Sequence, residues 1–224
     1  MRIIACQLNT PEWLKARLSI PSASCAEKLI TPAQLKPSKS ADLYLARLCA
    51  EYVLGQPLDE ASSGFMDRGH EMEAEAVRRY EFDRDVDTKA VGFCLHDTID
   101  FGASPDRLVG EDGLLEVKCP AAATIMAYHL NPELLKADHL MQVQAQLWVT
   151  GRKWCDLWAY APWLSVTLRI EPDPEVSAAL STHVPAFVAR LDAAKAKLQP
   201  LKAARSTEAA RAVAEAAASG DHDF

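Results

Sequence analysis

Several features that would place the chain in a specialised class are missing from the sequence. No apolar run approaches the ~18 residues of a membrane-spanning helix, and the N-terminal residues lack a secretory cleavage site. The six cysteines are scattered, with no CxxC pair and no Cys/His ligand spacing. These absences argue against a membrane protein, a zinc or iron–sulfur site and a disulfide scaffold, and they favour reduced thiols and a cytoplasmic location.

The length and composition are those of one globular domain. The chain has 224 residues, of which 49% are hydrophobic and 25% are charged, which is enough for one sizeable core. Neither an internal repeat nor an interdomain linker interrupts the sequence. We therefore expect a single domain over residues 1–224, whose last part, about 200–224, forms an Ala-rich helix and an acidic tail.

The net charge of −7 is unevenly distributed along the chain. Residues 1–50 carry seven Lys and Arg against three acids, whereas residues 51–120 carry seventeen acids against seven bases. A basic first part beside an acidic middle suits an enzyme that holds phosphates on one side and divalent metal on the other. An unevenly charged surface without any ligand would give the same distribution.

Hydrophobic periodicity and turn residues predict helices that alternate with strands. Helices are expected at 41–54, 65–81 and 133–150, and then from Pro174 to about Ala218 with breaks near Pro185 and Pro200. Gly55 and Gly151 are expected to end the first and third of these helices. Strands are expected at 90–96, 99–110, 114–119, 154–161 and 164–171. This order predicts an α/β fold with a central mixed β-sheet flanked by helices.

Acidic and basic side chains meet around one expected hairpin. Asp106 and Glu116 are separated by the turn sequence GEDG, so a hairpin folds the two carboxylates toward one another. Glu116 and Lys118 are two residues apart on a strand and therefore project from the same face. Burial of such a cluster is costly unless the charges are paired or bind a metal.

A divalent cation is a natural partner for these carboxylates. Mg²⁺ prefers one or two carboxylates, several waters and a substrate phosphate. It lowers the pKa of a bound water and stabilises charge on a phosphodiester in its transition state. Lys118 is suited to orient or deprotonate that water. The cluster therefore indicates metal-dependent phosphodiester hydrolysis.

The order Pro105-Asp106 and then Glu116-Val117-Lys118 resembles the PD-(D/E)xK signature of the restriction-endonuclease-like nucleases. Alone, this short pattern is also compatible with an ordinary surface hairpin. Three further stretches occur in the expected order and make the resemblance more specific: Trp13…Arg17…Ser24, Gly69–Ala76 and Gln142–Thr150. From about residue 11 to about residue 195, the chain resembles the phage lambda exonuclease-type family of viral recombinases and alkaline exonucleases.

The resemblance implies a role for each matching residue. Asp106, Glu116 and Glu73, with the carbonyl of Val117, would bind metal, and Lys118 would be catalytic. The residues that match the family's pocket for the 5′-terminal phosphate are Arg17, Ser24, Ser104 and Gln142. Arg offers a forked set of donors to phosphate oxygens, and Ser and Gln add neutral donors. Gln144 lies off the helical face of Gln142 and is expected to serve the fold.

The resemblance also implies an activity, partners and an assembly. It implies a Mg²⁺-dependent deoxyribonuclease, with two ions in each site and Mn²⁺ as a substitute. This enzyme digests linear double-stranded DNA in the 5′-to-3′ direction from a 5′-phosphate end, leaving 3′ single strands and mononucleotides. The family works in phage-type recombination with a single-strand annealing protein. The family forms a homotrimeric ring around DNA. Its members are encoded by phages or prophages and act in the cytoplasm of the bacterial host.

Other interpretations of the same residues remain open. Glu73 is also interpretable as an ordinary solvated acid, Arg17 as a surface charge, Ser24 as a helix cap in competition with Ser22, and Ser104 and Gln142 as structural residues. The tryptophans at 148, 154, 158 and 163 fit the core or a subunit contact better than base stacking. The competing functions are an endonuclease or repair-complex nuclease on the same core, and a non-catalytic module that binds DNA ends.

Overall fold

The computed structural model describes residues 1–58 and 64–219, with side chains over 1–58 and 72–208. Its helices are α1 (Pro11–Arg17), the 3-10 helix η1 (Ala23–Cys25), α2 (Ala26–Leu29), α3 (Ala41–Leu54), α4 (Gly64–Arg84), α5 (Ala122–Leu130), α6 (Pro132–Thr150) and α7 (Pro174–Ser219). Its strands are β1 (Arg2–Ile4), β2 (Thr88–Lys89), β3 (Phe93–Leu95), β4 (Gly102–Ala103), β5 (Arg107–Val109), β6 (Gly113–Lys118), β7 (Trp154–Ala161) and β8 (Leu164–Ile170). No helix in the described ranges is long and apolar enough to cross a membrane. The expected acidic tail at 220–224 lies outside those ranges.

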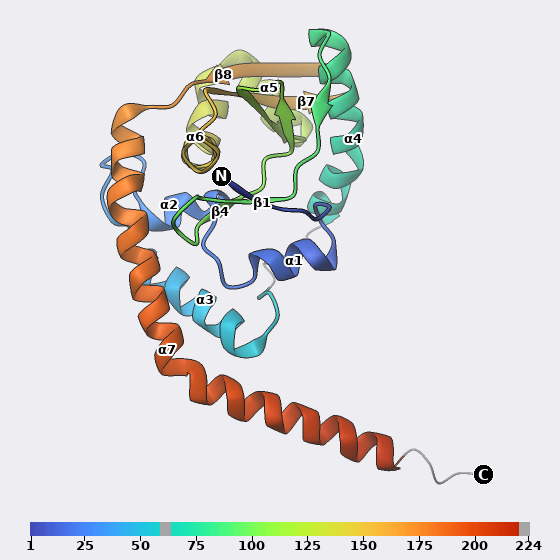
Figure 1. Cartoon of the computed structure of the whole chain (residues 1–224). Helices are drawn as coiled ribbons and strands as arrows, with labels where there is room; N and C mark the ends of the chain where they lie inside the picture. The colour runs from blue at the N-terminus through green and yellow to red at the C-terminus, as the bar shows by residue number, and fades with distance from the viewer. Residues whose placement is uncertain (59–63, 220–224) are drawn as a thin grey trace, which may run out of the picture.

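A mixed sheet of five strands, in the order β2-β5-β6-β7-β8, lies at the centre of the fold (Figure 1). Strands β6 and β7 are parallel, and every other neighbouring pair in this sheet is antiparallel. A parallel pair requires a crossover connection, which α5 and α6 provide. A smaller antiparallel sheet has the order β1-β3-β4. The expected α/β class with a mixed sheet is confirmed.

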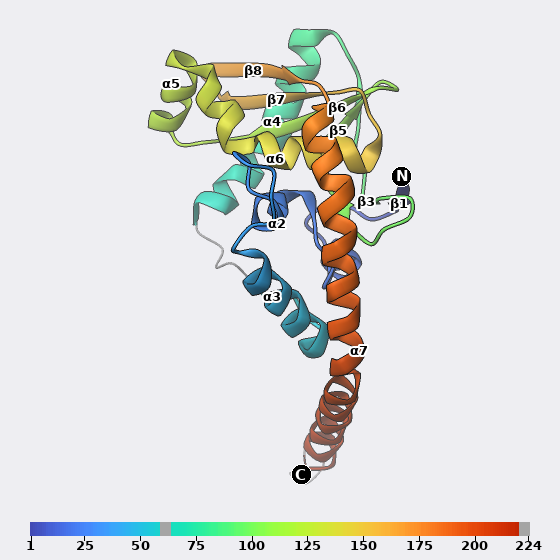
Figure 2. The same ribbon diagram turned by 90° about the vertical axis from the view of Figure 1, so that its left-hand side faces the viewer.

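Side chains of β6 alternate between two helical layers. Leu115 and Val117 pack against α4 together with Tyr80, whereas Leu114 belongs to the core on the side of α6. The sheet is therefore covered by α4 on one face and by α5 and α6 on the other (Figures 1 and 2). Because Glu116 shares the face of Leu114, its carboxylate is carried toward α6.

A third core joins the two ends of the chain. Residues of η1, α2 and α3 are buried there with apolar side chains of α7. The expected breaks in α7 at Pro185 and Pro200 are wrong, because the helix is continuous past both prolines. A proline removes one hydrogen bond of a helix, but burial of Val184 and Phe187 on either side of Pro185 holds this segment helical. Figure 1 shows α7 bending where it leaves the body of the molecule.

The remaining differences from expectation concern short elements. The expected strand 99–110 is divided into β4 and β5, which belong to different sheets, and β1, α1 and α5 were not expected at all. Gly55 and Gly151 end α3 and α6 in the left-handed conformation, as expected. Gln144 also serves the fold, because its side chain hydrogen-bonds the backbone at Glu171 and Asp173.

Candidate active site

The hairpin of β5 and β6 brings the expected acidic pair together. Arg107 pairs with Leu115 across the two strands, so Asp106 lies beside the end of β6. Asp106 Oδ2 accepts a hydrogen bond of 2.6 Å from the backbone N–H of Val117. The turn is closed by Gly110 at a φ of 53°, a left-handed conformation that glycine adopts without strain. This local geometry is the one that the GEDG sequence predicts.

Glu116 is the most densely bonded residue of the site. Its side chain is buried, and Oε1 accepts from Lys118 Nζ at 2.7 Å and from Gln142 Nε2 at 2.5 Å. Oε2 accepts from Gln146 Nε2 at 2.7 Å. Three hydrogen-bond donors thus satisfy this carboxylate, whose burial without partners would be costly. Its orientation is fixed before any ligand arrives.

Gln146 is the site residue that sequence reasoning missed. It lies one turn of α6 beyond Gln142, on the same helical face, and this i, i+4 spacing was the available signal. Gln142 also accepts from Lys118 Nζ, at 3.2 Å, so it braces the Glu116–Lys118 pair. The bracing interpretation of Gln142 therefore has direct geometric support, and a phosphate contact requires its amide to turn away from Glu116.

Burial and like charges act strongly on Asp106. Burial raises its pKa well above the usual range, and Glu116 and Glu73 raise it further, while Lys118 opposes them. Burial alone would lower the pKa of Lys118, but Glu116 and then Asp106 raise it overall. Lys118 is therefore the ammonium that offsets the negative charge of the cluster at neutral pH.

The donor set suits a hard cation. Glu116 and, on α4, Glu73 both act electrostatically on Asp106. Among the described residues, no three His, Cys, Asp or Glu side chains form a ready-made metal-binding group. The site thus presents Asp106 and Glu116 directly, with Glu73 further off. This arrangement fits Mg²⁺, which takes few carboxylates and completes its shell with water and phosphate.

All four residues expected to hold a phosphate line one hollow beside these carboxylates. This hollow, which we call the phosphate pocket, has a volume of about 150 Å³ and is lined in part by Arg17, Ser24, Ser104, Gln142, Asp106 and Glu116. Residues from α1, η1, the β4–β5 connection and α6 therefore meet at the cluster formed by the carboxylates and Lys118. The sequence alone did not show that these segments converge.

Arg17 supplies the positive charge of the phosphate pocket. Its guanidinium lies 4.3 Å from the ring centre of Trp13, and Trp13 Nε1 donates to Ser104 Oγ at 2.9 Å. Burial lowers the pKa of Arg17, yet a guanidinium remains charged at neutral pH. A partly desolvated cation beside neutral donors favours an anion as ligand.

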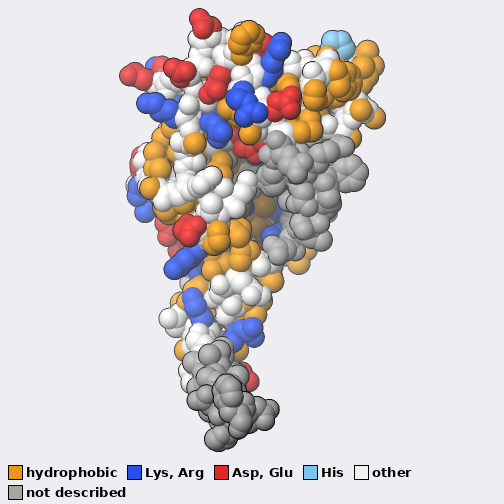
Figure 3. All heavy atoms as spheres, turned by 90° about the vertical axis from the view of Figure 1, so that its right-hand side faces the viewer, with side chains coloured by type: hydrophobic (Ala, Val, Ile, Leu, Met, Phe, Trp, Pro, Cys, Tyr) orange, Lys and Arg blue, Asp and Glu red, His pale blue; other side chains and the backbone are white. Residues whose placement is uncertain are grey.

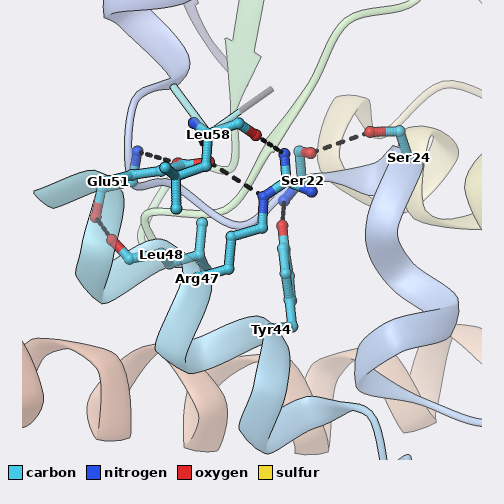
Figure 4. Close-up of polar contacts among 8 residues, drawn as sticks. Ser22, Ser24, Tyr44, Arg47, Leu48, Glu51 and Leu58 are labelled. Atoms are coloured by element: carbon cyan, nitrogen blue, oxygen red, sulfur yellow. Dashed lines mark hydrogen bonds and ion pairs between the residues drawn. The ribbon is translucent and has the colours of Figure 1, made fainter. Parts of the chain in front are cut away.

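A network behind the pocket fixes the segment that carries Ser24. Ser22 and Ser24 are in hydrogen-bond contact at 3.2 Å, and the backbone N–H of Ser22 donates to Tyr44 Oη at 3.3 Å (Figure 4). Glu51 of α3 accepts from the backbone of Ser19 and from Arg47. Ser24 lies inside η1, so it is not the helix cap considered as an alternative. These contacts anchor the pocket on α3.

The tryptophans divide between the core and the surface. Trp158 is buried against α4, and Trp148 donates to Ser181 and contacts the ring of Phe101. Arg169 stacks on Trp154 at 3.7 Å, whereas Trp163 is 57% exposed. None of these four lines the phosphate pocket, whereas Trp13 does.

The chain is similar to known proteins over most of its length. Residues 12–153 match the model of the YqaJ-like viral recombinase domain. The chain is similar to the alkaline exonuclease LHK-Exo from Laribacter hongkongensis, with 35% identity and a TM-score of 0.73, covering 88% of this chain and 99% of that one. The complex of LHK-Exo with dAMP gives 36% identity and a TM-score of 0.76 over the same shares of the two chains.

A phage-related exonuclease from Haemophilus somnus 129PT shares the fold at 14% identity, with a TM-score of 0.64 over 80% of this chain and 96% of that one. Among curated proteins, no sequence matches this chain. The fold and the similarity to LHK-Exo define a nuclease of the class that contains the alkaline exonucleases. Within that class, the chain belongs to the family of YqaJ-like viral recombinase domains.

Proposed function

We propose that this deoxyribonuclease digests linear double-stranded DNA from 5′-phosphate ends, with Mg²⁺ as cofactor, and leaves 3′ single strands and mononucleotides. One observation carries the proposal: the phosphate pocket and the carboxylate–lysine cluster share the side chains of Asp106, Glu116 and Gln142. A terminal phosphate bound at Arg17 would place the first internucleotide linkage against the carboxylates. Such an arrangement selects an end, whereas an endonuclease has no use for a closed anion pocket.

Asp106, Glu116 and Glu73, together with the carbonyl of Val117, would hold one or two Mg²⁺ ions, with Mn²⁺ as a substitute. When bound, the metal would activate water as a nucleophile and stabilise negative charge on the phosphate. Lys118 would then hold the attacking water through its ammonium and remain charged by its contact with Glu116. Gln142 and Gln146 would keep Glu116 oriented toward the metal.

The partners of the enzyme are proposed from the family. A YqaJ-like viral recombinase domain would leave its 3′ single strand to an annealing protein, in phage-type recombination in the bacterial cytoplasm. A homotrimeric ring around DNA would explain how a chain of net charge −7 stays on a polyanion, because enclosure replaces affinity. The single domain over residues 1–224 would then be the subunit of that ring.

The decisive experiment compares three DNA substrates under identical conditions: linear duplex with 5′-phosphate ends, the same duplex with 5′-hydroxyl ends, and a covalently closed circle. We expect the 5′-phosphate form to be digested fastest and the circle to resist. Arg17→Ala should remove most of the difference between the linear forms, since a charge-assisted contact contributes about 1.5–3 kcal/mol. Lys118→Ala should be folded and inactive on all three.

The alternatives give different patterns in the same assay. Cleavage of the circle would indicate an endonuclease, and tight binding to ends without hydrolysis would indicate a non-catalytic module. Ca²⁺ should support binding but not hydrolysis, because its larger and looser coordination shell positions water poorly. Release of nucleotides first from 3′ ends would contradict the proposed polarity.

A further inference from the structure

A second hollow adjoins the catalytic cluster. It has a volume of about 430 Å³ and lies between the loop of residues 6–9, the loop of residues 90–92, α4 at Glu73 and β5 at Arg107. The phosphate pocket, at about 150 Å³, is too small for more than a terminal phosphate and the group next to it. The DNA strand that follows the first nucleotide must therefore lie elsewhere.

Arg107 is the one cationic side chain that lines the second hollow among the described residues. Its Nη1 donates to the backbone carbonyl of Asp106 at 2.7 Å. Within the described part of the chain, its guanidinium has no carboxylate partner in an ion pair. Four further N–H donors of this forked group therefore remain for a ligand.

The position of Arg107 relative to Asp106 indicates the course that a DNA strand would take between the two hollows. Ser104, two residues before Asp106, lines the phosphate pocket, and Arg107, one residue after it, lines the second hollow. The phosphate pocket is thus lined by a residue that precedes Asp106, and the second hollow by the residue that follows it. A strand with its 5′ end at Ser104 would pass Asp106 and then reach Arg107.

We propose that the second hollow holds the second nucleotide of the digested strand, and that Arg107 binds the phosphate between the second and third nucleotides. This inference rests on the proposed function. Arg107 would be a substrate-binding residue that keeps the strand in place after the first nucleotide leaves. The forked guanidinium matches a phosphodiester, and the remaining described lining, Glu73 apart, is neutral.

The test uses 5′-phosphorylated duplex DNA in which the linkage between nucleotides two and three is an uncharged methylphosphonate. Release of the first nucleotide is measured in single turnover for the wild type and for Arg107→Gln. Lys153→Gln is the matched control, because it removes the same charge at the opposite end of the sheet, where Lys153 is 73% exposed. Binding of both DNAs is also measured by anisotropy in Ca²⁺.

We expect the methylphosphonate to slow the wild type and Lys153→Gln about tenfold and to weaken their binding similarly. Arg107→Gln should be about tenfold slower on ordinary DNA and should lose nothing more on the modified DNA. The proposal would be overturned if the wild type released the first nucleotide at equal rates from both DNAs. It would also be overturned if the methylphosphonate slowed Arg107→Gln by a further tenfold. If the wild type releases no 5′ nucleotide even from ordinary DNA, the proposed function itself fails.

Discussion

At the scale of single residues, the carboxylates of the site have opposite environments. Glu116 receives three side-chain donors, whereas Asp106 receives the N–H of Val117 and lies in the field of two other acids. Glu116 thereby has donors on both of its carboxylate oxygens, whereas ionised Asp106 is held at a cost to folding. The cluster becomes fully favourable only when a cation joins it.

Asp106→Asn should therefore stabilise the metal-free protein while it abolishes hydrolysis. Because the pKa of Asp106 is raised in the folded state, ionisation of this group destabilises the folded protein at any pH above the ordinary pKa of an aspartate. We expect the variant to gain roughly 1 kcal/mol at pH 8, which corresponds to a Tm higher by about 2–4 °C. The gain should shrink as the pH falls from the raised folded-state pKa toward the ordinary one, and it should disappear below about pH 3, where the aspartate is neutral in both states.

Thermal unfolding in EDTA across this pH range measures the effect. Mg²⁺ should reverse the order of the two proteins, since the wild type gains stability from binding and the variant gains less. A metal-free Asp106→Asn protein that melts below the wild type at pH 8 would contradict this account of the cluster. Glu116→Gln is the matched comparison, and it should not be stabilised, because Glu116 already has its donors.

At the scale of elements, a buried carboxylate of the sheet helps to hold α4 in position. Asp156 of β7 is buried and accepts two hydrogen bonds of 2.8 Å from Arg169. It also accepts from Tyr80 Oη of α4 at 2.7 Å. Because Glu73 lies on the same helix, this contact ties a proposed metal ligand to the sheet.

Asp156→Ala should destabilise the protein by about 3 kcal/mol, because it leaves a partly buried guanidinium and a buried phenol without their acceptor. For a chain of this length, the Tm should fall by roughly 6–12 °C. Asp112→Ala is the matched control, since its ion pair with Lys153 is exposed and contributes about 0–1 kcal/mol. Differential scanning calorimetry distinguishes the two, and equal losses would show that the Tyr80 contact is unimportant.

The sequence predicted those parts of the fold whose signals are local. Periodicity located α3 and α6, glycines located their ends, and the GEDG turn placed Asp106 beside Glu116. Elements of two or three residues, such as β1 and β2, were invisible because they are set by pairing with distant strands. The continuity of α7 through Pro185 was likewise decided by tertiary burial, which overrides local propensity.

For the candidate site, the sequence could predict which residues take part but not that they lie together in space. The resemblance selected Arg17, Ser24, Ser104 and Gln142, but their convergence arises from contacts between segments far apart in the sequence. Gln146 was missed because glutamine has no obligatory function on a helix. Its role appears only when the carboxylate of Glu116 is seen to point at it.

At the scale of the whole molecule, the surface carries apolar side chains without a partner in a single chain. Leu130 on α5 is 79% exposed, and Leu134 at the start of α6 is 43% exposed. Figure 3 shows hydrophobic side chains gathered at the end of the molecule where α5 lies. Apolar surface of this kind is typical of contacts between subunits.

Light scattering should give a mass near three chains for the wild type. Leu130→Glu should reduce assembly and processive digestion together, whereas Leu43→Glu, at a position on α3 that is 78% exposed, should change neither. An enclosed enzyme should also continue to digest after a salt jump or a competitor trap, although open electrostatic binding weakens steeply with salt. A wild-type monomer that digests long stretches in one encounter would rule out the ring.

The contact between the two ends of the chain bears on how the protein is made. Lys195 donates to the carbonyl of Ser19, 176 positions away, and Leu191 is buried in the same core as Ala23. Synthesis runs from the N-terminus, so the segment that carries Ser24 cannot settle until α7 has left the ribosome. The proposed phosphate pocket would thus be complete only after α7 has been synthesised. If Ser24 binds the terminal phosphate as proposed, a chain truncated before α7 should lose its preference for 5′-phosphate ends.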